Sequence, residues 1–147
     1  MKHSLTVSSL VLATITGVAL PATAQPASGT ETACTAATPA EQIALNAAKN
    51  EARQMAEVTN GGLGVYRAEP AMHGAAIASP CDMLDAETWR FTIRGGEPTA
   101  VALEETYTLL SVVTIQGTGR DRTVTLDYNG PIEQYIQIGR ASCRERV

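Results

Sequence analysis

The sequence predicts a small α+β domain in which one N-terminal amphipathic helix packs on a three- or four-stranded antiparallel meander sheet. Three observations support this fold class. A capping motif and an alanine-rich run predict a helix over 38–58. Alternating apolar residues over 87–94 predict a strand with one buried face, and similar alternation between glycine-rich turns predicts the remaining strands.

The first 24 residues have the three parts of a cleavable signal peptide. Lys2 and His3 provide a basic start, the apolar run 5–20 follows, and small residues up to Ala24 suit a signal peptidase. The run is too short for a membrane anchor, which is the alternative, and it ends in a processing site. We therefore expect export to the periplasm or the extracellular space, with no membrane partner after cleavage.

The last ten residues, 138–147, match the translation of a widely used short-read sequencing adapter. The adapter read as ATC GGA AGA GCG TCG TGT AGG GAA AGA GTG encodes them in order, and Gln137 is compatible with the two bases that precede this frame. We therefore expect 138–147, including Cys143, to be an artefact, and we leave the segment out of the fold prediction. The natural end of the chain is then expected beyond residue 137.

The predicted mature segment, 25–137, is acidic. The whole chain holds 11 lysines and arginines and 15 aspartates and glutamates. Leaving out both ends removes four basic residues and one acidic residue, so the mature segment has a net charge of −7. Nucleic acids and anionic membranes reward clustered lysine and arginine, so neither is expected as a partner. The predicted partner is an unknown protein or a small ligand.

The segment 38–137 is long enough for one domain, and a flexible leader rich in small residues, 25–37, precedes it. Two cysteines remain, Cys34 and Cys81, and one pair in an exported chain suggests a structural disulfide. A redox or metal-binding pair is the alternative, but the cysteines of a redox motif lie close together in sequence and these two do not.

The helix begins at the capping box Thr38-Pro39-Ala40-Glu41, with proline at the first helical position. Asn60-Gly61-Gly62 ends it, because these residues tolerate left-handed geometry. The expected buried face is mostly alanine, which lets the helix lie close to the sheet. It comprises Ala44, Leu45, Ala48, Ala52, Met55 and Thr59. The residues expected away from it are Asn46, Lys49, Asn50, Arg53 and Glu57.

The segment 62–85 is predicted to be an irregular loop, because glycine and proline interrupt it repeatedly. In the strand 87–94, Trp89, Phe91 and Ile93 are expected on the face that packs on the alanine face of the helix.

A second strand is predicted over 101–115, with a bend or bulge near Leu110-Ser111 because the span exceeds an ordinary strand. A hairpin loop at 117–121 leads to the last strand. The side chains of that strand expected to face inward are Val124, Leu126 and Tyr128.

The loop segment 66–74 holds the only unusual local chemistry. His73 is the only histidine in 25–137, and any function for it requires partners, of which Glu69 and Tyr66 are nearest in sequence. Four residues are therefore candidate ligand contacts: Tyr66, Arg67, Glu69 and His73. The alternative is that His73 is an ordinary loop histidine with no function in binding or catalysis. No catalytic residue, metal site or cofactor is predicted, because no zinc-site spacing and no phosphate-binding glycine motif is present.

Three arginines are expected on the outer face of the sheet. Arg90, Arg94 and Arg122 are predicted to share that face with Glu104 and Asp127. Cross-strand ion pairing on a solvated face is the expected arrangement, and an anion-binding patch is the alternative.

The sequence resembles a family of small exported bacterial proteins of unknown function. The resemblance lies in the motif Asn-Gly-Gly-Leu-Gly at 60–64, in Tyr66 to Gly74 and in Asp127 to Pro131. The resemblance covers most of the mature segment and implies no activity. More loosely, an alanine-rich helix followed by a meander ending in Asp127-x-x-Gly130 is similar to PepSY-type domains, although the long loop 63–85 departs from that pattern. This second resemblance implies an inhibitory or binding module.

The leading hypothesis is a non-enzymatic exported binding or interaction module. The alternatives are a small secreted hydrolase that uses the 66–73 loop, and a small-ligand carrier with a cavity between helix and sheet. The sequence does not predict the oligomeric state.

Overall fold

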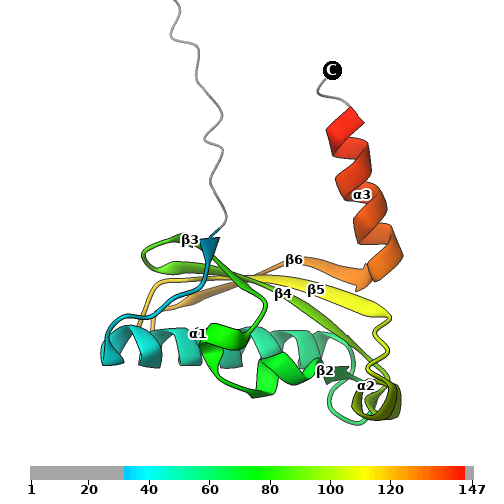
Figure 1. Cartoon of the computed structure of the whole chain (residues 1–147), viewed down its shortest axis with the longest axis horizontal. Helices are drawn as coiled ribbons and strands as arrows, with labels where there is room; N and C mark the ends of the chain where they lie inside the picture. The colour runs from blue at the N-terminus through cyan, green and yellow to red at the C-terminus, as the bar shows by residue number, and fades with distance from the viewer. Residues whose placement is uncertain (1–31, 145–147) are drawn as a thin grey trace, which may run out of the picture.

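A computed structural model of the chain describes residues 32–144 (Figure 1). These residues form three α-helices and a six-stranded antiparallel sheet, so the predicted α+β class is confirmed. The predicted signal peptide, 1–24, lies outside the described residues. None of the helices within 32–144 is long and apolar enough to cross a membrane.

The elements are more numerous than expected. The helices are α1 (Pro39–Thr59), α2 (Pro98–Glu104) and α3 (Ile132–Arg144), with the short 3₁₀ helices η1 (Pro70–His73) and η2 (Ala76–Ala78). The strands are β1 (Thr32–Ala33), β2 (Arg67–Ala68), β3 (Cys81–Asp85), β4 (Thr88–Gly96), β5 (Leu109–Gln116) and β6 (Thr123–Pro131). Their order in the sheet is β1-β3-β4-β5-β6, and β2 pairs with the end of β4. Figure 1 shows α1 along one face of the sheet and α3 rising on the opposite side.

Both predicted ends of α1 are confirmed. The Thr38 hydroxyl accepts from the Glu41 backbone N–H at 3.2 Å, and the Glu41 carboxylate accepts from the Thr38 N–H at 3.1 Å. Asn60 caps the other end, and Gly61 and Gly62 follow with positive φ angles of 95° and 83°. Local hydrogen-bonding and glycine geometry are therefore sufficient to bound this helix.

The predicted buried face of α1 is correct near its middle and wrong on one flank. Ala48 and Ala52 are fully buried, but Thr59 is exposed. Lys49 and Glu57, expected away from the buried face, are buried. The reason is that η1 and η2 pack along a second flank of α1, so the helix is covered on two sides.

The core lies between α1 and the sheet, as the alternation over 87–94 predicted. Trp89, Phe91 and Ile93 are buried in one cluster with the alanines of α1. Val113 and Ile115 of β5 complete this layer. The small alanine side chains let the helix approach the sheet closely, and the larger side chains of the strands fill the space between them.

The prediction of an irregular loop over 62–85 was wrong, because the segment contains β2, η1 and η2 and ends in β3. β3 begins at Cys81 and pairs with β4, and Cys34 forms the predicted disulfide with Cys81 across a Cα–Cα distance of 5.5 Å. The Cys34 N–H also donates to the Cys81 carbonyl at 3.1 Å. This covalent link holds β1 against β3, so residues 32–34 are joined to the sheet.

The prediction of a strand over 101–115 was wrong in its first part, which is α2. The Glu97 carboxylate accepts from the N–H groups of Thr99 and Ala100 at 3.0 and 2.8 Å, and Pro98 occupies the first turn. Glu105 ends the helix with a φ of 50°. A capping carboxylate followed by proline is a helix start, and it outweighed the apolar alternation beyond it.

The bulge between β5 and β6 reverses the predicted orientation of Tyr128. The register shifts between Val112 and Val113, which pair with Tyr128 and Leu126. Asp127 is the extra residue, so Tyr128 lies on the face opposite to Leu126, where its ring centroid is 4.9 Å from that of Tyr135. A bend or bulge was expected in the strand itself near Leu110-Ser111, but β5 pairs with β4 without a shift and the extra residue lies in β6.

Candidate functional site

The structure divides the four predicted ligand contacts between two environments. Tyr66 and Glu69 are buried, whereas Arg67 and His73 are exposed. Arg67 and His73 line a single pocket of about 420 Å³, and Tyr66 and Glu69 do not. The rest of the pocket lining comes from α1, from the loop after it and from α2: Arg53, Leu63 and Pro98. We refer to this hollow as the arginine–histidine pocket.

Both carboxylate oxygens of Glu69 bind Arg94 of β4. Its carboxylate accepts from the Arg94 backbone N–H at 2.8 Å and from the Arg94 guanidinium at 2.7 and 3.2 Å. This pairing raises the pKa of Arg94. The same guanidinium lies 4.8 Å from the centre of the Tyr107 ring. Glu69 therefore connects the segment after β2 to the end of the sheet and has no carboxylate oxygen left without a partner.

We expect Glu69→Ala to lower the free energy of unfolding by about 2 kcal/mol, because it leaves the Arg94 backbone N–H without its acceptor. Glu69→Gln, which keeps one acceptor oxygen, should lower it by about 1 kcal/mol. Urea denaturation monitored by Trp89 fluorescence measures both. The exposed Glu104→Ala is the matched control and should change stability by less than about 0.5 kcal/mol. Equal stabilities of Glu69→Ala and the control would contradict the assigned role.

Only 1% of the Tyr66 surface is exposed, and its hydroxyl has no hydrogen bond of ordinary geometry. Burial raises the pKa of Tyr66 to about 12, and the nearby Ser111 hydroxyl opposes this shift only in part. The phenol therefore stays protonated near neutral pH. With Glu69 occupied as well, neither residue is an acid–base partner for His73 of the kind that the hydrolase alternative requires.

Positive charge gathers around the arginine–histidine pocket. Arg53 Nη1 donates to both carboxylate oxygens of Glu57, at 2.9 and 2.8 Å. Lys49 Nζ donates to the carbonyl of Gly74 at 2.5 Å. The Arg67 side chain makes no hydrogen bond or ion pair with any residue within 32–144. One arginine is therefore anchored, and the other is available to a ligand.

His73 is held mainly in its neutral form. Partial burial lowers the pKa of His73, and the Arg53 and Arg67 charges lower it further. The Glu57 carboxylate and hydrogen bonding to the backbone of Ala68 oppose these effects without cancelling them. The imidazole therefore gains a proton at a lower pH than an ordinary histidine, unless a negative group enters the pocket.

Two of the arginines expected on the outer face of the sheet, Arg94 and Arg122, pair with other residues than Glu104 and Asp127. Arg94 binds Glu69, and Arg122 reaches α1, where its guanidinium binds the Glu51 carboxylate at 2.5 Å. Asp127 instead accepts from the Thr114 hydroxyl at 2.5 Å. Arg94 and Arg122 thus join separate elements to one another rather than forming a shared anion-binding patch.

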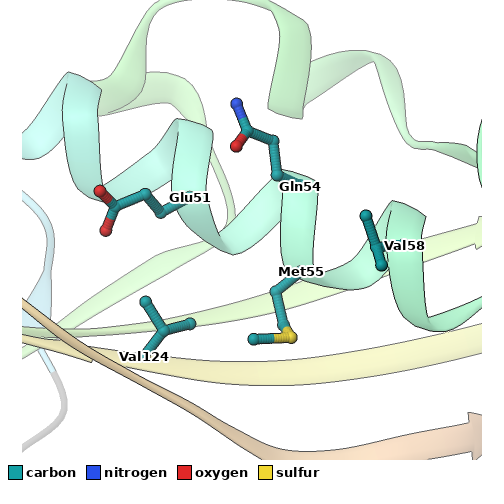
Figure 2. Close-up of a pocket in the computed structure, with 5 residues that line it drawn as sticks. All are labelled: Glu51, Gln54, Met55, Val58 and Val124. Carbon is teal, nitrogen blue, oxygen red and sulfur yellow. The ribbon is translucent and has the colours of Figure 1, made fainter.

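A second hollow, of about 280 Å³, lies between α1 and β6 (Figure 2). Figure 2 shows Met55 pointing from the helix toward the sheet and Val124 rising from β6 toward it. Glu51, Gln54 and Val58 complete the lining. This hollow is mostly apolar and shallow, in contrast to the charged arginine–histidine pocket.

Sequence reasoning identified Arg67 and His73 and missed Arg53, Leu63 and Pro98. These three lie in separate elements, and no local pattern joins them to the 66–73 segment. The capping role of Glu97 would have placed Pro98 at a helix start, but not beside Arg67.

No group of three or more histidine, cysteine, aspartate or glutamate residues in the described part of the chain is placed to hold a metal ion. Comparison of the chain with protein-family models, with curated proteins and with solved structures found no match.

Proposed function

We propose that this protein is a non-enzymatic exported binding module whose ligand enters the arginine–histidine pocket. The lining of the pocket carries the proposal. Two guanidinium groups and one imidazole converge on a hollow that also has an apolar wall, formed by Leu63 and Pro98. A few convergent polar groups beside apolar side chains are the usual composition of a small-ligand site.

The same lining supports binding over catalysis. Its five residues bring no hydroxyl, thiol or carboxylate group to the pocket, so His73 has no nucleophile beside it to activate. The Cys34–Cys81 disulfide supports the exported part of the proposal, because such bonds persist in oxidising compartments.

The packing of α1 favours this surface pocket over a cavity between helix and sheet. Ala48, Ala52 and Ala56 are fully buried against Phe91 and its neighbours. A ligand between these layers would have to separate a close-packed core, at a cost that a small contact area does not offset. The helix and the strands β3 to β6 act, in this proposal, as the rigid support of the pocket.

A thermal-shift screen of small solutes, charged and neutral, tests the proposal. A ligand present at about 100 times its Kd should raise the free energy of unfolding by about 2.7 kcal/mol and the melting temperature by about 10 °C. The double variant Arg67→Ala/His73→Ala should lose this shift. Arg120→Ala, which removes an exposed arginine from the β5–β6 loop, is the matched control and should keep it.

Two outcomes would contradict the proposal. One is the absence of any stabilising solute for the wild-type protein across the charged and neutral classes. The other is an equal shift in the wild type and in the double variant, which would place the binding elsewhere.

A further inference from the structure

The arginine–histidine pocket is a positive region on an acidic protein. Arg53 and Arg67 line it, Lys49 binds the carbonyl of Gly74 next to His73, and the Glu57 carboxylate binds Arg53. On α2, Glu97 precedes the lining residue Pro98, and its carboxylate is taken up by the N–H groups at the start of that helix. The chain as a whole carries a net charge of −4. The pocket therefore attracts anions locally, although the molecule as a whole repels them.

The two arginines of the pocket come from regular elements of the fold. Arg67 lies on β2, which pairs with the end of β4 through Arg67 and Gly96. Arg53 is fixed by its two hydrogen bonds to Glu57 in the middle of α1. Guanidinium groups bind carboxylate, phosphate and sulfate oxygens through paired N–H donors, and the pairing of β2 fixes the backbone position from which the Arg67 side chain reaches the pocket.

We propose that the arginine–histidine pocket binds a compact oxyanion through Arg67, and that it binds this anion more tightly when His73 is protonated. This inference rests on the proposed function and adds the ligand class and its regulation. The anion neutralises part of the charge of the two arginines that face His73, so the imidazole accepts a proton more readily in the complex than in the free protein. The imidazolium then donates to the anion as a further cationic group.

The sign of the pH effect follows from linkage. Free His73 has a pKa below its ordinary value of 6.5, because burial and the two arginines disfavour the charged form. A bound anion raises the pKa of His73, so binding takes up a proton as the pH falls through the pKa of the complex. Affinity therefore rises as the pH falls, until the free protein also becomes protonated. A rise of one pKa unit on binding gives at most about a tenfold gain in affinity.

Isothermal titration calorimetry with sulfate and with pyruvate, at about pH 8 and about pH 5, measures this effect. Both probes keep their charge over that range, and they distinguish a tetrahedral from a planar oxyanion. We expect at least one of them to bind about tenfold more tightly at the lower pH. Arg67→Ala should weaken binding about tenfold at both pH values. His73→Gln should keep the affinity measured at the higher pH and lose the gain.

Arg120→Ala removes one positive charge outside the pocket and should match the wild type at both pH values. A uniform loss in Arg120→Ala and Arg67→Ala would show a general charge effect and overturn the inference. An unchanged pH dependence in His73→Gln would also overturn it. If neutral solutes shift the melting temperature and depend on Arg67, but neither anion binds, the proposed function stands and this inference fails.

Discussion

Replacement of Cys34 and Cys81 together by serine is expected to lower the free energy of unfolding by about 4 kcal/mol. The two cysteines are 47 residues apart, and their disulfide restricts the unfolded chain over that whole loop. In the folded state the bond also holds β1 against β3 at the edge of the sheet. Small domains have limited cores, so a loss of this size is a large fraction of their total stability.

Urea denaturation with and without a reducing agent measures the effect of the disulfide. The reduced wild type should be about as unstable as the double serine variant, and the reducing agent should not change the variant. A loss below about 1 kcal/mol would contradict the expectation that the disulfide is a main source of stability.

Gly95→Ala is expected to lower the free energy of unfolding by about 3 kcal/mol, at the upper end of the usual range for overpacking. An added Cβ at this position would overlap the ring and hydroxyl of Tyr66. That ring is fully buried and cannot move aside without displacing the core around it. Gly95 therefore lets the Tyr66 ring lie against the backbone of β4.

Chemical denaturation of two further variants tests this cause. Gly96→Ala makes the same change at the next residue, where the added Cβ would lie 3.1 Å from the Thr108 hydroxyl, and should cost less. In the background of Tyr66→Ala, Gly95→Ala should cost less than about 1 kcal/mol, because the atoms that it meets are gone. Additive losses in the double variant would show that the Tyr66 ring is not the cause.

The elements that were predicted correctly carry their own local signal. The capping box at Thr38 and the glycines after Asn60 bound α1, because both depend on backbone groups within a few residues. The alternation around Trp89 predicted the buried face of β4, because side chains of a strand alternate between its two faces.

The structure predictions failed where two local sequence signals pointed to different elements, or where a segment distant in sequence packs against the element. From Val101 onward the apolar alternation suggested a strand, but the cap at Glu97 starts a helix there. One extra residue, Asp127, was enough to turn Tyr128 to the other face of the sheet. Lys49 is buried because η1 and η2 cover a second flank of α1, which no pattern within the helix indicates.

By itself the sequence determined the α+β class, the bounds of α1 and the pairing of Cys34 with Cys81. The class depends on apolar periodicity and the bounds of α1 on contacts within a few residues, and the disulfide was predicted because only two cysteines remain in 25–137. Only the tertiary structure decided that Arg53 meets Arg67 and His73 at one hollow, while Tyr66 and Glu69 are buried and do not line it. Contacts of this kind join separate elements, and their geometry follows from how the whole core packs rather than from any pattern within one element.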